Sequence, residues 1–237
     1  MEHIEKFLRI ASMIGFPVSF DNAKILDFGC GSGTSVVEAR AAGLDVFGCD
    51  IADGLGSAPR ALVEEGVLRT IDMSNYEIPF KEDEFDMVVS HQVLEHVQNY
   101  DEVLLEIRRV LKAGGVSIHI FSSRYTPIEP HAYVPLATIV RSMSWLKFWA
   151  YLGIRNEYQK ALPARKVAEL NHEYLHTCTN YLTKGELRRQ MSKSFATVLC
   201  VEREYLAAGK GYGPKIVKLP FLPYLFGALV HKVIALA

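Results

Sequence analysis

A glycine-rich turn near the start of the 237-residue chain combines residue types that suit an anionic ligand. It reads Asp27-Phe-Gly29-Cys-Gly31-Ser-Gly33 and stands between a segment that predicts a strand and one that predicts a helix. Glycines let the backbone turn tightly and approach a ligand closely. The helix that follows offers unpaired N–H groups and a partial positive charge at its N-terminus. An amino-acid carboxylate would fit there.

Two further acids end the next two predicted strands. Asp50 comes about 20 residues beyond the turn, where a carboxylate can accept both hydroxyls of a ribose. Asp72 could accept from an adenine amino group while Met73 packs on the ring. Taken singly, these features could also be a ligand-free turn, a helix cap and an ordinary strand end. Together they predict a nucleoside-sized ligand that carries an amino-acid head.

The turn does not match the two common nucleotide-binding motifs. The dinucleotide fingerprint G-x-G-x-x-G would need a glycine at Thr34, and no Walker lysine follows the turn. An NAD-dependent oxidoreductase remains an alternative, because the strand–turn–helix order and Asp50 fit it. The missing glycine and the presence of Asp72 count against that alternative.

Strand and helix signals alternate through the first half of the chain, with the strands separated by helices. This order predicts a parallel sheet with right-handed crossovers. The expected fold class is α/β, a doubly wound and mostly parallel sheet with an inserted, mainly helical lid. The predicted strands span residues 23–28, 45–49, 67–71, 85–90 and 116–121, and the predicted helices span residues 34–42 and 100–111.

Three stretches of sequence resemble class I S-adenosylmethionine-dependent methyltransferases. ILDFGCGSGTSVVEARAAGLDVFGCDI resembles their first two motifs. IPFKEDEFDMVVSHQVLEHV and EIRRVLKAGGVSIHIF resemble their later motifs. The similarity is greatest to the broad methyltransferase type 11-like group that includes ubiquinone-biosynthesis methyltransferases. It covers about residues 23–121, resumes at 183–201, and is specific for the cofactor rather than for the substrate.

The resemblance implies S-adenosylmethionine as cofactor and methyl transfer to a small-molecule or lipid-linked acceptor. In the family pattern the glycines contact the methionine part, the first acid orders the turn, the second binds the ribose and the third the adenine. The position after the fourth strand lines the methyl-donor pocket. The cofactor-binding residues implied in this way are Asp27, Gly29, Cys30, Gly31, Gly33, Asp50, Ile51, Asp72, Met73 and His91.

A general base is needed only if the acceptor must lose a proton, because the sulfonium already activates the methyl carbon. His91, at the end of the fourth strand, is the first candidate, and its alternative role is a wall of the cofactor pocket. His131 is the second candidate, in the sequence Glu129-Pro130-His131 that opens the insertion. His96 is expected to be structural. His172 and His176 would share one solvent-exposed helix face.

No metal site is expected from the spacing of ligand residues. His91-Gln-Val-Leu-Glu95-His96 differs by one residue from the pattern H-x-x-E-H. The four cysteines show no CxxC spacing and are expected to be free thiols, as in a reducing cytosol.

We expect one methyltransferase domain over residues 1–237. Residues 1–22 predict an N-terminal helix, 23–121 the cofactor-binding core, and 122–182 an aromatic-rich insertion that would form a substrate lid. Residues 183–237 predict a helix with a Thr183–Glu186 capping box, a strand over 195–201 and an apolar tail. Whether this tail ends in a seventh strand or a docked helix is left open.

Charge and hydropathy indicate which partners to expect. A formal net charge of -1 gives no electrostatic reason for a nucleic-acid partner. No transmembrane segment is predicted, and the expected location is cytoplasmic. Two interpretations of the tail remain open, a fold over the sheet edge and a peripheral membrane contact, the latter also compatible with a non-catalytic cofactor-binding protein. The membrane interpretation rests on Phe221, Tyr224, Leu225 and Phe226 near Lys215, Lys218 and Lys232.

Overall fold

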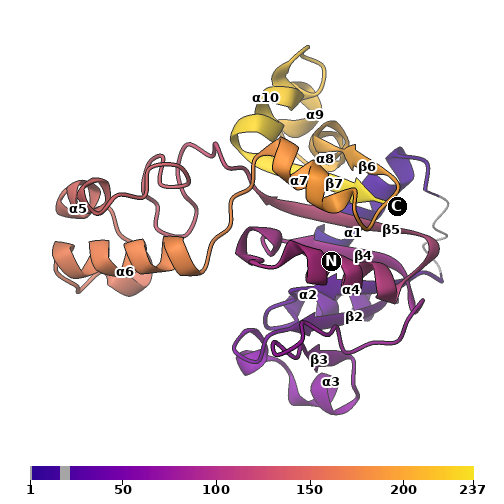
Figure 1. Ribbon diagram of the computed structural model, residues 1–237. Coiled ribbons are helices and arrows are strands. Elements are labelled where there is room, and N and C mark those ends of the chain that lie inside the picture. Colours follow the sequence, from indigo (N-terminus) through magenta and orange to yellow (C-terminus); the bar gives the residue numbers. More distant parts are fainter. Residues whose placement is uncertain (1, 17–21) are drawn as a thin grey trace.

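Seven strands form a single sheet in the computed structural model, which describes residues 2–16 and 22–237 (Figure 1). Their order is β3-β2-β1-β4-β5-β7-β6. The first five strands are parallel, and β7 runs antiparallel between β5 and β6. The strands are β1 (Lys24–Phe28), β2 (Asp45–Asp50), β3 (Leu68–Thr70), β4 (Phe85–His91), β5 (Leu111–Ser122), β6 (Val198–Cys200) and β7 (His231–Leu236).

Helices cover both faces of this sheet and bury two separate hydrophobic clusters against it. One cluster joins the sheet to α1, α2 and α8, and the other joins it to α4 and α7. The expected doubly wound, mostly parallel α/β fold is therefore confirmed. The helices are α1 (Glu2–Met13), α2 (Thr34–Ala41), α3 (Arg60–Glu64), α4 (Tyr100–Val110), α5 (Met143–Tyr151), α6 (Ala164–Thr177), α7 (Lys184–Met191), α8 (Glu202–Ala208), α9 (Gly213–Ile216) and α10 (Leu222–Leu229), with short 3₁₀ helices η1 (Gly54–Ser57), η2 (Leu94–His96) and η3 (Glu157–Gln159).

The periodicity of α4 explains its place in the fold. Val103, Leu104, Ile107 and Val110 recur at helical spacing, and all four are buried. A single apolar stripe of this kind packs on the sheet and leaves the polar side chains in solvent.

At the N-terminus, α1 ends at Met13, so it is shorter than the helix predicted over residues 1–22. Of that range, residues 1 and 17–21 lie outside the described part of the chain.

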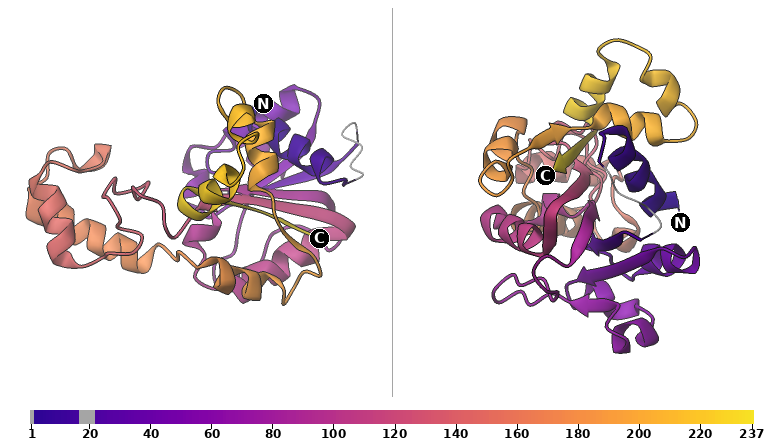
Figure 2. Two further views of the ribbon diagram at one scale, coloured as in Figure 1. Left: turned by 90° about the horizontal axis from the view of Figure 1, so that it is seen from above. Right: turned by 90° about the vertical axis from the view of Figure 1, so that its right-hand side faces the viewer.

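The insertion between β5 and α7 forms an arm with its own small core. Helices α5 and α6 pack against each other and against the preceding loops around buried residues such as Val134, Leu146 and Leu175. Figure 1 and the left view of Figure 2 show this arm projecting away from the sheet. The expected helical character of the insertion is confirmed, whereas its role as a substrate lid remains a prediction.

The C-terminal segment contains both elements between which the sequence left the choice open. Helix α10 leads into β7, which pairs with β5 and with β6. The strand predicted over 195–201 is present but shorter, because β6 spans only Val198–Cys200, and α8 follows it. Thr183 caps α7 and forms the predicted capping box with Glu186.

The burial of His119 inside the sheet predicts that the fold loses stability in acid. It is fully buried on β5, with its Nδ1 2.7 Å from Ser90 Oγ and its Nε2 2.8 Å from Ser117 Oγ. Burial lowers the pKa of His119 to about 3. An unfolded histidine takes up a proton near pH 6.5, so stability that is present above this value is lost as the pH falls toward 3.

His119→Gln should remove this pH dependence. Between pH 7 and pH 5 the wild type should lose about 2 kcal/mol of unfolding free energy through this histidine, and the variant should lose that much less. Urea unfolding at both pH values measures the difference, with His176→Gln, a variant of an exposed residue on α6, as control. Equal losses in the wild type and His119→Gln would contradict the assignment.

Candidate active site

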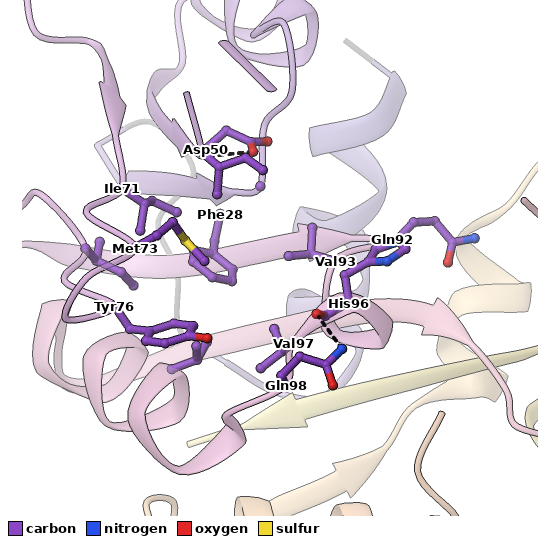
Figure 3. A pocket seen from close by; sticks show the side chains of 14 residues that line it. Phe28, Asp50, Ile71, Met73, Tyr76, Gln92, Val93, His96, Val97 and Gln98 are labelled. Atoms are coloured by element: carbon purple, nitrogen blue, oxygen red, sulfur yellow. Dashed lines mark hydrogen bonds between the residues drawn. The ribbon is translucent and has the colours of Figure 1, made fainter. Parts of the chain in front are cut away.

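Two neighbouring cavities lie at the carboxyl ends of the central strands. The larger has a volume of about 380 Å³ and the smaller about 300 Å³, and Gly29 lines both. Parallel α/β sheets bind ligands at this edge. The larger cavity is lined by Phe28, Gly29, Asp50, Ile51, Ile71, Met73, Tyr76, Ile78, Gln92, Val93, His96, Val97, Gln98 and Val103 (Figure 3). The smaller is lined by His3, Asp27, Gly29, Cys30, Gly31, Thr34, Ser35 and His91.

The glycine turn requires glycine for two different reasons. Gly29, Gly31 and Gly33 all have positive φ angles, of +78°, +55° and +76°. A Cβ at Gly29 would overlap the methyl groups of Val93, and one at Gly33 would come within 2.5 Å of Leu68 Cδ1. A Cβ at Gly31 would meet nothing within 4 Å. The turn thus packs tightly at its two ends and leaves open space at Gly31, where a ligand can approach the backbone.

Asp27 links the glycine turn to α2 through a hydrogen bond. Its buried carboxylate accepts a hydrogen bond from Ser35 Oγ in the first turn of α2. Burial raises the pKa of Asp27 to about 6, while the bond from Ser35 opposes that shift. This arrangement agrees with the ordering role that the sequence predicts for Asp27.

Asp50 joins the turn to the larger cavity. Its Oδ2 accepts from the Gly31 N–H at 2.6 Å, and its Oδ1 accepts from the Ile51 N–H at 2.7 Å. Each carboxylate oxygen has further lone pairs, and the side chain lines the cavity (Figure 3). Asp50 is therefore placed to accept hydroxyl groups from a ligand there, and Ile51 lies beside it in the same wall.

Asp72 and Met73, which follow β3, point to different places. Met73 lines the larger cavity, together with Tyr76, which sequence reasoning missed. Asp72 is not among the lining residues. It is exposed, and its Oδ1 accepts from the backbone N–H and hydroxyl of Ser74, at 2.9 and 2.7 Å. The structure thus brings Met73 but not Asp72 to the cavity, and the predicted contact between Asp72 and adenine remains untested.

The wall opposite Asp50 comes from the segment after β4, which the sequence analysis left without a role in binding. Val93, His96, Val97 and Gln98 line the larger cavity there (Figure 3). Gln92 also lines it, but its amide points away toward Ser122 and His231. The sequence could have indicated these lining residues by their position alone, because the segment after β4 leaves the sheet at the same edge as the glycine turn. His96, expected to be structural, is one of these lining residues.

The two predicted catalytic histidines lie in different places. His91 lines the smaller cavity, with its ring 4.8 Å from that of His3 on α1. Burial, followed by the nearby charges of His3, His231 and Lys6, lowers the pKa of His91 to about 4. His91 is thus neutral near pH 7 and only a weak base, which favours its alternative role as a wall of the pocket.

His131 belongs to a buried polar group at the base of the arm. Its Nδ1 donates to Glu129 Oε1 at 2.8 Å, and Tyr181 donates to the same oxygen at 2.7 Å. Its ring lies 4.8 Å from the ring of His96. His131 therefore touches a wall of the larger cavity through His96, while His91 lines the smaller one.

Glu95 and His96 follow each other in η2. Glu95 is 1% exposed, and burial raises its pKa to about 7. His96 Nδ1 lies 2.8 Å from the carbonyl oxygen of Cys178. One ligand atom each from Glu95, His96 and His131 lie within 4.8 Å of one another, a grouping that the spacing test for metal motifs could not detect.

His172 and His176 lie together on α6, as their spacing predicts. Their rings stack with centroids 4.2 Å apart, and His172 is partly exposed while His176 is exposed. Of the cysteines, Cys178 and Cys200 are exposed, Cys30 is partly buried and Cys49 is buried, and all four are free thiols.

Comparison with known proteins agrees with this geometry. Residues 26–119 match a family model described as a methyltransferase domain. The chain is 32% identical over 121 residues to a ubiquinone biosynthesis O-methyltransferase of Roseobacter denitrificans, a match that covers 50% of this chain and 47% of that protein. It is 33% identical over 110 residues to a demethylmenaquinone methyltransferase of Bacillus subtilis, covering 44% of this chain and 47% of that protein. These matches span less than half of each relative.

A solved structure shares the fold over nearly the whole chain. It is an S-adenosylmethionine dependent methyltransferase from Mesorhizobium loti, which matches with a TM-score of 0.54 and 15% identity. The match covers 97% of this chain and 96% of that protein. Residues 26–119 therefore match a methyltransferase domain, and the chain as a whole shares the fold of a solved S-adenosylmethionine dependent methyltransferase.

Proposed function

We propose that this protein transfers a methyl group from S-adenosylmethionine to a small-molecule or lipid-linked acceptor. The single observation that carries the proposal is that two neighbouring cavities share Gly29 in their linings. The larger cavity holds Asp50 and an apolar wall that suit a nucleoside, and the smaller lies against the glycine turn that suits an amino-acid head. One ligand that carries both parts would occupy both cavities.

The residues present fit the two ends of this cofactor. The open space at Gly31 lets a carboxylate or amino group approach the backbone, next to the N-terminus of α2. Asp50 would accept the ribose hydroxyls, and Met73, Ile71 and Tyr76 would pack around the base. S-adenosylmethionine supplies a methyl group that its sulfonium already activates. No phosphate-binding lysine is therefore needed.

The task left to the protein is to hold the acceptor in line with that methyl group and to exclude water. Correct orientation of two reactants can supply about 7–11 kcal/mol of the barrier reduction. Residues of the wall opposite Asp50, among them His96 and Gln98, line the cavity and would orient the acceptor. A closing movement of the arm would exclude water from the same space.

A lipid-linked acceptor is supported by the surface of the C-terminal segment. Around α10, Leu219, Phe221, Tyr224 and Leu225 are between 51% and 79% exposed. Lys215 and Lys218 lie exposed in the preceding turns. Apolar side chains flanked by lysines are typical of peripheral contact with an anionic membrane. No helix among the described residues has the length and apolar character needed to cross a bilayer.

Vesicle flotation tests this membrane contact. The wild type should float with phosphatidylglycerol vesicles and much less with neutral phosphatidylcholine, because charge and apolar contact act together. The variant Phe221→Ser/Leu225→Ser should lose most of that binding. The matched control Phe148→Ser/Leu152→Ser changes two exposed apolar residues of the arm and should float as the wild type does. A wild type that does not float, or a tail variant that floats equally, would contradict the proposal.

Methyl transfer itself is tested with the purified protein, a cell extract and S-adenosylmethionine carrying a labelled methyl group. The protein should label an extract component, which mass spectrometry then identifies. A non-catalytic cofactor-binding protein would bind S-adenosylhomocysteine but leave every extract component unlabelled. Asp50→Ala serves as the control for labelling by other enzymes of the extract.

A further inference from the structure

The cluster of Glu95, His96 and His131 joins the sheet-bearing core to the base of the arm. Glu95 and His96 belong to η2, directly after β4, whereas His131 comes from the loop that opens the insertion. One ligand atom from each lies within 4.8 Å of the other two. Two imidazoles and one carboxylate are a ligand set of catalytic zinc and non-haem iron sites.

Glu95 is the second, independent observation. Its side chain is 1% exposed, and neither carboxylate oxygen makes a hydrogen bond of standard geometry among the described residues. The backbone N–H groups of Glu95 and Ser122 act on this carboxylate, but they do not offset the effect of burial, which raises its pKa. Burying a carboxylate without partners costs several kcal/mol. A cation at this place would supply the missing partner.

Both histidines have the tautomer that a metal site requires. His96 Nδ1 lies 2.8 Å from the Cys178 carbonyl, which can only accept, so Nδ1 carries the proton and Nε2 keeps its lone pair. His131 Nδ1 donates to Glu129 Oε1 at 2.8 Å, which leaves its Nε2 in the same state. Metal-binding histidines commonly donate their other N–H to a carbonyl or a carboxylate in this way.

Glu129 is itself held in place. Its Oε1 also accepts from Tyr181, and its Oε2 accepts from the Ala132 N–H at 2.6 Å. Tyr181 and the backbone amides thus keep this buried carboxylate directed at His131. Such a supporting carboxylate fixes the orientation of the imidazole and raises its basicity.

We propose that Glu95, His96 and His131 bind one divalent transition-metal ion, with Glu129 as a positioning residue for His131. The chemistry of the ligands favours Zn²⁺ or a similar ion over Mg²⁺, because Mg²⁺ prefers an all-oxygen octahedral shell. Three protein ligands leave a coordination position open for water or substrate. Since His96 also lines the larger cavity, that position can take an oxygen atom of the acceptor. This last use of the ion rests on the proposed methyl transfer, whereas binding of the ion does not.

Metal titration of the full-length protein, stripped with a chelator, tests the site. The wild type should bind one equivalent of Zn²⁺ tightly and bind Mg²⁺ at least about 100-fold more weakly. Co²⁺ should give a visible absorption band that Zn²⁺ displaces. Glu95→Gln and His131→Gln should each abolish the band and the tight equivalent, and Glu129→Gln should weaken Zn²⁺ binding by about 10- to 100-fold.

The surface pair His172 and His176 provides the matched control. Histidines four residues apart on a helix can themselves hold Zn²⁺, so this pair must be tested as an alternative site. If the tight equivalent binds at Glu95, His96 and His131, His172→Gln/His176→Gln should leave it intact. Glu95→Gln removes an unpartnered buried charge, so it should not lower the Tm of the metal-free protein, and far-UV circular dichroism checks that each variant folds. Loss of the tight equivalent in the surface variant, or its survival in Glu95→Gln and His131→Gln, would overturn the proposal.

The wild type is also titrated with S-adenosylhomocysteine in the absence of metal, which separates the two proposals. Binding of S-adenosylhomocysteine without tight Zn²⁺ binding would overturn the metal site and leave methyl transfer standing. Tight Zn²⁺ binding without S-adenosylhomocysteine binding would support the metal site and contradict methyl transfer.

Discussion

Asp50→Ala should weaken the affinity for S-adenosylmethionine by at least about 100-fold. The carboxylate lines the larger cavity and is placed to accept two ribose hydroxyls, and each hydrogen bond to a charged group contributes about 1.5–3 kcal/mol. The substitution also removes the partner of the Gly31 N–H, which loosens the turn that holds the methionine part. Equilibrium dialysis with labelled S-adenosylmethionine measures the loss.

Asp53→Ala is the matched control for this prediction. Asp53 lies three positions beyond Asp50, is exposed, does not line the larger cavity and makes no side-chain cap hydrogen bond to η1. Its removal changes the net charge by the same amount, so affinity should stay within about twofold of the wild type. If both variants bind as tightly as the wild type, Asp50 has no role in holding the ribose.

Gly29→Ala should lower the unfolding free energy by about 3 kcal/mol. About 1 kcal/mol comes from a positive φ angle of +78°, which alanine adopts at a cost. The rest comes from overlap of the new methyl group with Val93, because overpacking a filled site typically costs about 1–3 kcal/mol. Urea unfolding monitored by circular dichroism measures this loss.

Two further variants separate these contributions. Gly43→Ala has a φ angle of +87° but open space around the new Cβ, so it should lose only about 1 kcal/mol. Gly29→Ala should likewise cost only about 1 kcal/mol when introduced into Val93→Ala, where the overlap is relieved. An equal cost of Gly29→Ala in both backgrounds would show that contact with Val93 plays no part.

Features that depend on local sequence were predictable. The apolar runs gave the parallel strands, and the glycine turn and Asp50 had to lie at the same sheet edge because parallel strands all end there. The turn and Asp50 do line the two neighbouring cavities, and a hydrogen bond links them directly. Their roles toward the cofactor remain predictions.

Asp72 shows where local reasoning fails. The sequence places this acid at a strand end, but a side-chain oxygen can bond to the backbone two residues on and to a neighbouring hydroxyl. Ser74 supplies both groups, and the carboxylate of Asp72 is held in its own turn. Nothing in the pattern of one sequence decides between this turn and a contact with a ligand.

The cluster around Glu95 could not be predicted for a different reason. Metal motifs are recognised by short spacings, and the residues around His91 fail such a test by one position. The third member, His131, comes from an insertion without regular periodicity, so only the tertiary fold brings it to His96.

The short helix α8 was not predicted either, because seven residues show too little of a helical period.

Calorimetric titration of the wild-type protein with S-adenosylhomocysteine, and separately with NADH, tests the central claim most directly. The protein should bind one equivalent of S-adenosylhomocysteine with saturable heat and show none with NADH. Folded protein that gives no heat with S-adenosylhomocysteine, or that binds NADH instead, would contradict the account.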